Sequence, residues 1–208
     1  MSGLRAILTV VSALVLLGVG GAELAVAQPS PPAAPPAPGA PPQDNASRPD
    51  GQQPGDAFGE EVTLPGRTIV YLKGRSKWDA AFDTLVDAFK SLNEYLDKQD
   101  IKPTGAAMTI YTETDDSGFS FQAAMPIAAA PENPPKGDIA VGQTPSGRAL
   151  KFVHRGSYDA MDSTFEAISN YLDDKHLEAK ELFIEEYATD LVKADAENLV
   201  VNVFVPLK

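Results

Sequence analysis

Leu182-Phe183-Ile184-Glu185-Glu186-Tyr187 has the composition of a buried strand, yet it carries two adjacent carboxylates. Alternate residues of a strand share a face, so Phe183, Glu185 and Tyr187 point one way and the other three residues point the opposite way. A carboxylate between two aromatic side chains is costly to bury unless a positive group meets it. The stretch therefore indicates the wall of a ligand pocket. The alternatives are a solvated sheet face and an edge strand protected by inward-pointing charge.

The elements around this strand recur in the same order in two halves of the chain. Strands are expected at 62–64, 67–73, 107–112 and 119–126 in the first half, and at 139–144, 148–154, 182–187 and 199–206 in the second. Between them, apolar residues at helical spacing predict one helix after Ser76 and another after Ser157. The predicted helix faces consist of Trp78, Phe82, Leu85, Phe89, Leu92 and Leu96, and of Met161, Phe165, Ile168 and Leu172.

Sequence matches between the halves support an internal repeat. The segment RTIVYLKGRS (67–76) matches RALKFVHRGS (148–157), and Tyr95-Leu96-Asp97 matches Tyr171-Leu172-Asp173. Two repeats, at about 60–127 and 138–208, each predict a unit of β-hairpin, helix and β-hairpin. The expected fold class is α+β, a pseudo-two-fold tandem repeat. Two helices pack on one face of its antiparallel sheet, and a ligand cleft lies on the other.

Comparison of the two halves selects candidate site residues. Tyr187 aligns with Tyr111, whereas Glu185 aligns with Thr109, so only the second half adds a carboxylate. Gln122 and Asn202 also align, and we expect both amides on the face away from the helices, together with Glu185. The predicted ligand-binding set is Glu185, Tyr187, Tyr111, Asn202 and Gln122. Plain solvent exposure is the alternative explanation for the two amides.

The N-terminal residues have the features of an export signal followed by a linker. A 17-residue apolar run follows Arg5, and Ala25-Val26-Ala27 resembles a cleavage site, so residues 1–27 are expected to be a signal peptide. Residues 28–57 contain ten prolines and predict an extended linker. The folded domain is expected at 58–208, exported to the periplasm or secreted. No stable membrane span would remain after cleavage, and an uncleaved N-terminal membrane anchor is the alternative.

Composition narrows the possible partners and chemistry. The net charge is −12, and from residue 58 onward 25 acidic residues face 15 basic ones with no basic cluster. This argues against nucleic acid and favours a cationic or neutral small molecule. The chain has no cysteine, and its two histidines are His154 and His176. We therefore expect no metal site and no cofactor, whereas the composition leaves the oligomeric state open.

Four segments of the second half carry a resemblance to a known family: His154-Arg155-Gly156-Ser157-Tyr158, Asn170-Tyr171-Leu172, Glu185-Glu186-Tyr187-Ala188-Thr189-Asp190 and Val203-Phe204-Val205-Pro206-Leu207-Lys208. Through these segments the second half resembles the GyrI-like, or AraC-type, effector-binding domain. The first half resembles the weaker first repeat of the same family. The resemblance implies a pseudo-two-fold sheet with a central cleft that binds small molecules, many of them lipophilic cations. It also implies that Glu185 sits in the cleft, with Tyr187 as an aromatic wall.

Three functions follow from these observations. The first is a small-molecule binding protein of the cell envelope, with a lipophilic or cationic ligand held beside a central Glu. The second, suggested by resemblance to hydrolases of the family, is an enzyme that uses Glu185 as a general base. The third is an envelope protein-interaction module that docks a partner on the sheet face. No helix-turn-helix is evident, which argues against control of transcription.

Overall fold

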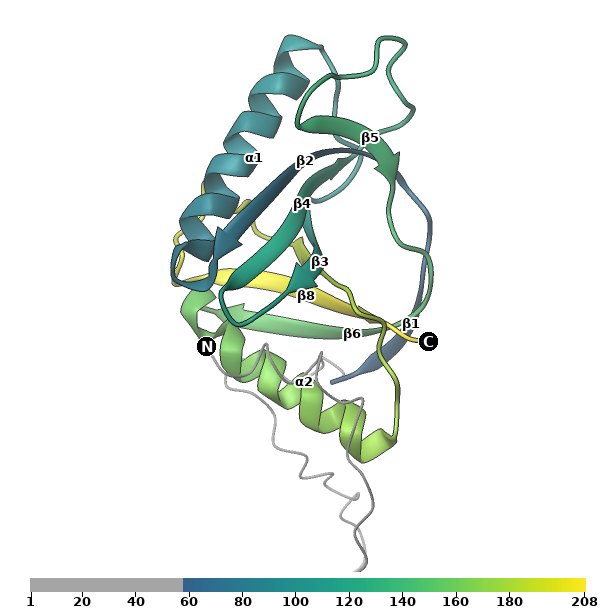
Figure 1. Ribbon diagram of the computed structural model, residues 1–208, viewed down its shortest axis with the longest axis vertical. Coiled ribbons are helices and arrows are strands. Elements are labelled where there is room, and N and C mark those ends of the chain that lie inside the picture. The colour runs from purple at the N-terminus through teal and green to yellow at the C-terminus, as the bar shows by residue number, and fades with distance from the viewer. Residues whose placement is uncertain (1–57) are drawn as a thin grey trace, which may run out of the picture.

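The computed structural model describes residues 58–208, which form an eight-stranded antiparallel sheet and two α-helices (Figure 1). In chain order the elements are β1 (Glu60–Leu64), β2 (Thr68–Lys77), α1 (Ala81–Lys98), β3 (Met108–Thr114), β4 (Gly118–Pro126), β5 (Ile139–Gln143), β6 (Gly147–Gly156), α2 (Met161–Lys175), β7 (Phe183–Tyr187) and β8 (Leu199–Pro206). The α+β class is confirmed. The predicted signal peptide (1–27) and linker (28–57) lie outside the described residues.

The strand order is β1-β6-β8-β7-β3-β4-β2-β5, so β7 and β3 lie side by side at the centre of the sheet. Both halves of the chain contribute their elements in the same order, but the internal repeat itself stays a prediction. The predicted first hairpin of each half is wrong. β1 pairs with β6 and β5 pairs with β2, so each of these strands joins the other half of the sheet.

Two short connections force the sheet to curl. β1 and β2 lie six positions apart in the sheet, which is roughly 29 Å across a flat sheet. Residues 65–67 join them and reach only about 14 Å when extended. Residues 144–146 join β5 to β6 in the same way. The connections meet at Arg67 and Thr144, which form two hydrogen bonds: the Arg67 amide donates to the Thr144 side-chain Oγ1 (2.9 Å), and the Thr144 amide donates to the Arg67 carbonyl (2.9 Å).

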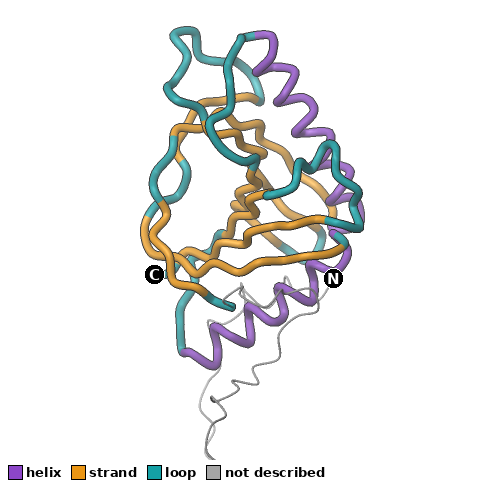
Figure 2. Tube along the Cα trace, turned by 180° about the vertical axis from the view of Figure 1, so that it is seen from behind, coloured by secondary structure: helices purple, strands orange, loops and turns teal. Residues whose placement is uncertain are grey.

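Both faces of the curved sheet are packed with apolar side chains. The two helices cover the outer face, as the views from front and back show (Figures 1 and 2). The stripe of α2 and the first half of the α1 stripe join one large cluster with β3, β4, β6, β7 and β8, whereas Leu92 and Leu96 of α1 pack with Val70 and Ile127. The inner face holds a second, smaller cluster of Ile69, Met108, Ile110, Ala124 and Ile184, all at most 4% exposed. The middle of the predicted cleft face is therefore part of the core, whereas Gln122, Glu186 and Asn202 on the same face are partly exposed.

Each α-helix is preceded by a 3₁₀ turn, at Trp78–Ala80 and at Tyr158–Ala160. Ser157 occupies the N-cap position of its turn, but neither it nor Lys77, the N-cap of the other turn, forms a side-chain capping bond. Ser76, the predicted cap, lies in β2. The predicted stripe of α1 is buried from Leu85 to Leu96, whereas Trp78 and Phe82 are only partly buried. Neither helix in residues 58–208 is long and apolar enough to cross a membrane.

Candidate ligand-binding cleft

A cavity of about 580 Å³ opens between the starts of the two helices and the centre of the sheet. This volume lies within the range of pockets that hold drug-sized molecules. Two helix starts, two central strands and the loop before β8 contribute to its lining: Trp78, Asp79, Ala80, Ala81, Phe82, Asp83, Tyr111, Tyr158, Asp159, Met161, Asp162, Phe165, Glu185, Ala196 and Glu197.

Glu185 points into this cavity from the helix-covered face of the sheet, not from the face that the sequence predicted. It lies directly opposite Val203 in the β7–β8 pair, and Val203 belongs to the large core cluster. Directly opposite residues of an antiparallel pair share a face. The predicted alternation within 182–187 is confirmed, because Ile184 packs in the inner cluster and Glu185 is 1% exposed on the other side.

Two tyrosine hydroxyls, not a positive side chain, meet the buried carboxylate. Tyr187 donates to Glu185 Oε2 at 2.8 Å, and Tyr111 donates to the same oxygen at 3.0 Å. A hydroxyl has one proton, so the further bonds of these tyrosines must be accepted ones. Tyr158 therefore donates to the Tyr111 hydroxyl (3.0 Å), and Thr109 donates to the Tyr187 hydroxyl (2.8 Å). The result is a chain of five polar groups, all buried except the partly exposed Tyr158, in which every donor points toward Glu185.

Burial is the main cause of the pKa shifts in this network. It raises the pKa of Glu185 to about 7, and the hydrogen bonds from Tyr187 and Tyr111 only partly oppose the shift. The pKa values of Tyr111, Tyr158 and Tyr187 lie well above their usual value, because burial and the nearby Glu185 both disfavour a phenolate. The tyrosines therefore remain neutral donors, and Glu185 is the group that changes charge near neutral pH.

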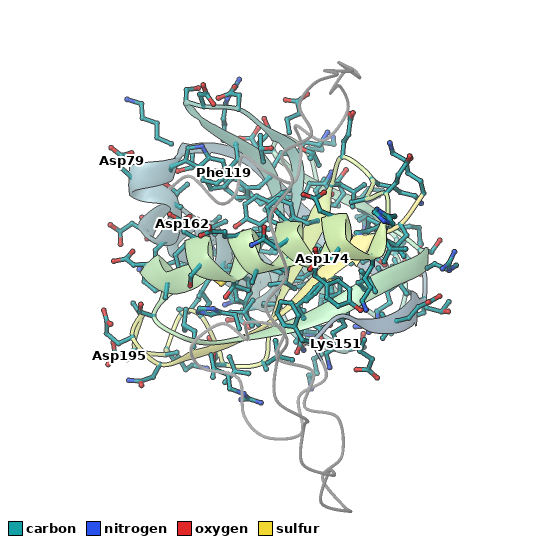
Figure 3. All side chains as sticks on the ribbon, turned by 90° about the horizontal axis from the view of Figure 1, so that it is seen from below. Asp79, Phe119, Lys151, Asp162, Asp174 and Asp195 are labelled. Atoms are coloured by element: carbon teal, nitrogen blue, oxygen red, sulfur yellow. The ribbon has the colours of Figure 1, made fainter. Side chains whose placement is uncertain are left out.

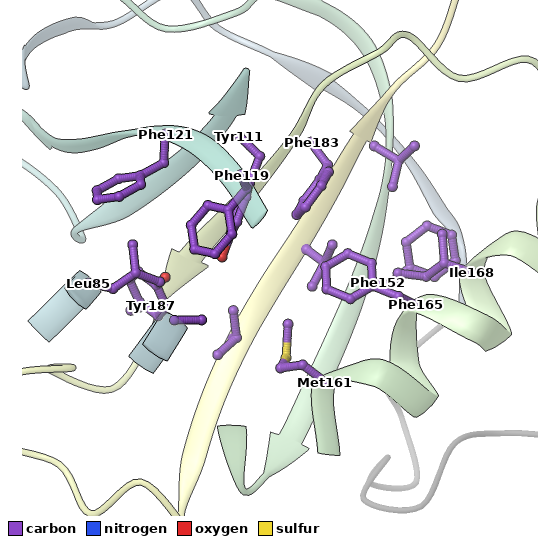
Figure 4. Packing of buried hydrophobic residues seen from close by; sticks show 14 of the residues in the cluster. Leu85, Tyr111, Phe119, Phe121, Phe152, Met161, Phe165, Ile168, Phe183 and Tyr187 are labelled. Carbon is purple, nitrogen blue, oxygen red and sulfur yellow. The ribbon is translucent and has the colours of Figure 1, made fainter. Parts of the chain in front are cut away.

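Aromatic rings surround the polar chain. Tyr111 stacks on Phe183 with ring centroids 4.2 Å apart, and Phe119 contacts Tyr111 at 5.0 Å. Figure 4 shows these three rings side by side above the start of α2, with Met161 and Phe165 below them. At the mouth of the cavity, Phe82 of α1 contacts Tyr158 at 5.3 Å, which links the two helix starts. The carboxylate thus lies among aromatic rings, five of which line the cavity: Trp78, Phe82, Tyr111, Tyr158 and Phe165.

Comparison with known proteins places this arrangement in a family. Residues 60–208 match the family described as the GyrI-like small molecule binding domain. The chain belongs to this GyrI-like family. No curated protein matches it. The protein is therefore a GyrI-like small-molecule binding domain, preceded by residues that the family match does not cover.

Solved structures with the GyrI-like fold share little sequence with this chain. SAV2435 bound to tetraphenylphosphonium is 14% identical, with a TM-score of 0.51 over 73% of this chain and 94% of that one. EcmrR in its complex with DNA is 14% identical, with a TM-score of 0.62 over 72% of this chain but only 56% of that one. A hydrolase from Listeria innocua is 10% identical, with a TM-score of 0.50 over 73% and 92%. At these identities the likeness establishes the fold alone.

The structure brings three of the five predicted site residues of this GyrI-like domain together. Glu185, Tyr187 and Tyr111 form the polar chain beside the cavity, although Tyr187 is not among the lining residues. Gln122 and Asn202 lie on the inner face of the sheet, as predicted, and so lie away from Glu185. Asn202 there donates to Glu186 (3.2 Å).

Acidic side chains line the mouth of the GyrI-like cleft. Asp79 and Asp83 come from the start of the first helix, and Asp159 and Asp162 come from the start of the second. Figure 3 shows Asp79 and Asp162 on the same side of the molecule. Glu197 adds a fifth carboxylate, and no Lys, Arg or His is among the lining residues. Within residues 58–208 no group of three or more His, Cys, Asp or Glu side chains is arranged to hold a metal ion.

The sequence reasoning did not identify Trp78, Phe82 and Tyr158 as cleft residues. Trp78 and Phe82 continue the apolar stripe of α1, so their spacing indicated core. Tyr158 directly follows Ser157 in a segment that carried the family resemblance, and this position was its only signal. All three lie where a strand turns into a helix, and periodicity is least informative at such boundaries.

Proposed function

We propose that this protein binds lipophilic cations in the cleft between its helices, with Glu185 as the counter-charge. The observation that carries the proposal is a carboxylate, 1% exposed, that lines an aromatic cavity without a basic partner. An ionised carboxylate in a site of low dielectric attracts a cation far more strongly than it would in water. Aromatic faces add cation–π attraction.

The charge around the cleft supports the same ligand class. Six of the fifteen lining residues are Asp or Glu, so an approaching cation meets negative potential before it reaches Glu185. An anion would be repelled by the acidic side chains at the mouth of the cleft and again by the Glu185 carboxylate at its base. A neutral aromatic molecule would gain the apolar contacts but would leave the carboxylate without a counter-charge. SAV2435, a structural neighbour, is bound to a lipophilic cation, which agrees with the proposal.

We further propose that the protein works in the cell envelope as a sensor, scavenger or carrier. The support is the predicted signal peptide at 1–27, which lies outside the described residues. Fusion of residues 1–57 to a reporter that is active only after export tests this location. An inactive reporter would contradict it.

The binding proposal is tested by thermal stabilisation of the mature chain, that is, residues 28–208 without the predicted signal peptide. Tetraphenylphosphonium is compared with triphenylphosphine oxide, a neutral molecule with similar rings. A ligand at 100 times its dissociation constant stabilises the folded protein by about 2.7 kcal/mol. We expect the cation to stabilise the wild type, to lose most of this effect with Glu185→Gln, and to keep it with Glu186→Gln. Equal stabilisation of the wild type by both molecules would contradict the charge argument.

A hydrolase is the second candidate, because burial holds the pKa of Glu185 near 7 at the edge of a cavity. A general base is most effective when its pKa lies near the working pH. Hydrolysis of aryl esters or strained-ring electrophiles that Glu185→Gln abolishes would support this function. The docking alternative has less support, because the apolar residues of the inner sheet face, such as Ile110 and Ile184, are buried.

A further inference from the structure

The two oxygens of the Glu185 carboxylate have different surroundings. Both tyrosine hydrogen bonds converge on Oε2, from Tyr187 at 2.8 Å and from Tyr111 at 3.0 Å. Within residues 58–208, no donor lies within hydrogen-bond distance of Oε1. Buried carboxylate oxygens normally have a partner, because leaving an acceptor unsatisfied costs free energy.

The neighbours of Glu185 explain why the protein itself does not supply this partner. Val203 lies directly opposite in β8 and Thr109 directly opposite in β3, and the hydroxyl of Thr109 is engaged by Tyr187. Phe165 and Met161, which approach from α2, have no side-chain donor. Glu185 lines the cavity, so a molecule bound there can supply the donor that the protein does not.

We propose that Oε1 of Glu185 selects ligands whose positive charge carries an N–H bond, so that the cognate ligand is a protonated aromatic amine. This inference rests on the proposed function and narrows its ligand class. A quaternary ammonium or a phosphonium neutralises the charge of Glu185 but has no N–H bond to donate to Oε1. A protonated amine supplies both at one atom, and hydrogen bonds between charged groups are about twice as strong as neutral ones. The aromatic part of the ligand then packs against Trp78, Phe82 and Tyr158.

The arrangement of the tyrosines sharpens this selection. Tyr111 and Tyr187 each donate to Oε2, which fixes the carboxylate and leaves Oε1 as the acceptor for the ligand. The carboxylate needs no rearrangement when the ligand arrives. Such preorganisation raises affinity because less freedom is lost on binding.

Three naphthylmethyl cations separate the N–H bond from size and charge. The first carries a protonated dimethylamino group, the second its quaternary trimethyl counterpart, and the third a protonated ethylmethylamino group, which has the same atoms and charge as the second but keeps N–H. Affinities are measured at pH 7.5 by titration calorimetry of the mature chain. We expect the first and third to bind alike, and the second to bind about tenfold or more weakly, as the loss of a charged hydrogen bond implies.

Glu185→Gln and Glu186→Gln serve as matched variants. We expect the preference for N–H cations to shrink in the first and to persist in the second, because Glu186 faces the inner side of the sheet. Equal binding of all three cations would overturn the inference. Binding of the ethylmethylamino cation as weak as that of the trimethyl cation would also overturn it, because the size of the ammonium group, and not the N–H bond, would then determine affinity. In both cases the binding of cations as such would stand. Failure of these cations and of tetraphenylphosphonium to bind would instead refute the proposed function.

Discussion

Thr109 and Glu185 lie directly opposite each other on the two central strands, β3 and β7, and Tyr187 hydrogen-bonds to both side chains. The middle of the sheet is thus occupied by buried polar groups that hydrogen-bond to one another, with Oε1 of Glu185 left as an open acceptor. A single charge-carrying group, Glu185, controls the electrostatics of this centre.

Glu185→Gln is expected to stabilise the ligand-free protein at pH 8 and to have little effect at pH 4.5. The pKa of Glu185 is raised from 4.5 to about 7, so the folded protein retains a proton that the unfolded chain loses between these values. The stabilisation from this group is therefore fully present below about pH 4.5 and is lost as the pH rises through 7. The whole span corresponds to about 3 kcal/mol at most. Denaturant titrations at the two pH values measure the difference.

Glu186→Gln provides the control for this titration. Glu186 is paired with Arg67 at 3.4 Å and is partly exposed on the opposite face. We expect its substitution to change stability by well under 1 kcal/mol, as for other half-exposed ion pairs. A Glu185→Gln protein that is no more stable than wild type at pH 8 would show that the carboxylate is not desolvated.

Binding of a lipophilic cation is expected to weaken as the pH falls below about 7. Protonation of Glu185 removes the counter-charge, so affinity for tetraphenylphosphonium should drop toward the level of Glu185→Gln by pH 5. By linkage, binding at pH 6 should release a proton. Calorimetry in two buffers with different ionisation enthalpies counts the protons. No proton release at pH 6 would contradict the assignment of Glu185 as the counter-charge.

Tyr187→Phe is expected to shift this pH dependence upward. The hydrogen bond from Tyr187 lowers the pKa of Glu185, so its loss should raise that pKa further and require a higher pH for tight cation binding. Tyr158→Phe is the matched control, because Tyr158 bonds to Tyr111 and not to the carboxylate. The midpoint of affinity against pH should move clearly in the first variant and much less in the second. Equal shifts in both would refute the direct role of Tyr187.

Trp78 should report on occupation of the cleft. It is the only tryptophan in the chain, it lines the cavity, and its indole nitrogen donates to the Asp115 carbonyl at 2.8 Å. We expect a cation that fills the cavity to change the intensity or the wavelength of its fluorescence. A ligand that stabilises the protein without any change in this emission would bind elsewhere.

The sequence predicted the elements of the fold better than their pairing. Alternation in 182–187 and the helical stripe of α1 are local patterns; the first is confirmed, and the second is confirmed from Leu85 to Leu96. The pairing of β1 with β6 depends on contacts between distant parts of the chain, and turn residues such as Pro65-Gly66 indicated a hairpin instead. The composition of a strand does not reveal which other strand pairs with it in the sheet.

The sequence predicted only part of the site, because contacts between distant residues also determine which face of the sheet carries it. Glu185 was assigned to the face away from the helices because burial of a carboxylate is costly. The compensation comes from Tyr187 in the same strand and from Tyr111, more than seventy residues earlier in the chain, and the local pattern cannot show the contact with Tyr111. The amides Gln122 and Asn202 do lie on that other face, so the error concerned the side of the sheet that carries the cleft.

The exchange of β1 and β5 between the two halves has a consequence for folding. Neither half alone contains the partner of its own first strand, so a fragment that ends near residue 127 would leave β1 unpaired and β2 without β5. We therefore expect residues 60–208 to unfold in a single cooperative transition. A molecule bound at the cleft would then protect backbone amides as far away as the Arg67–Thr144 junction from hydrogen exchange.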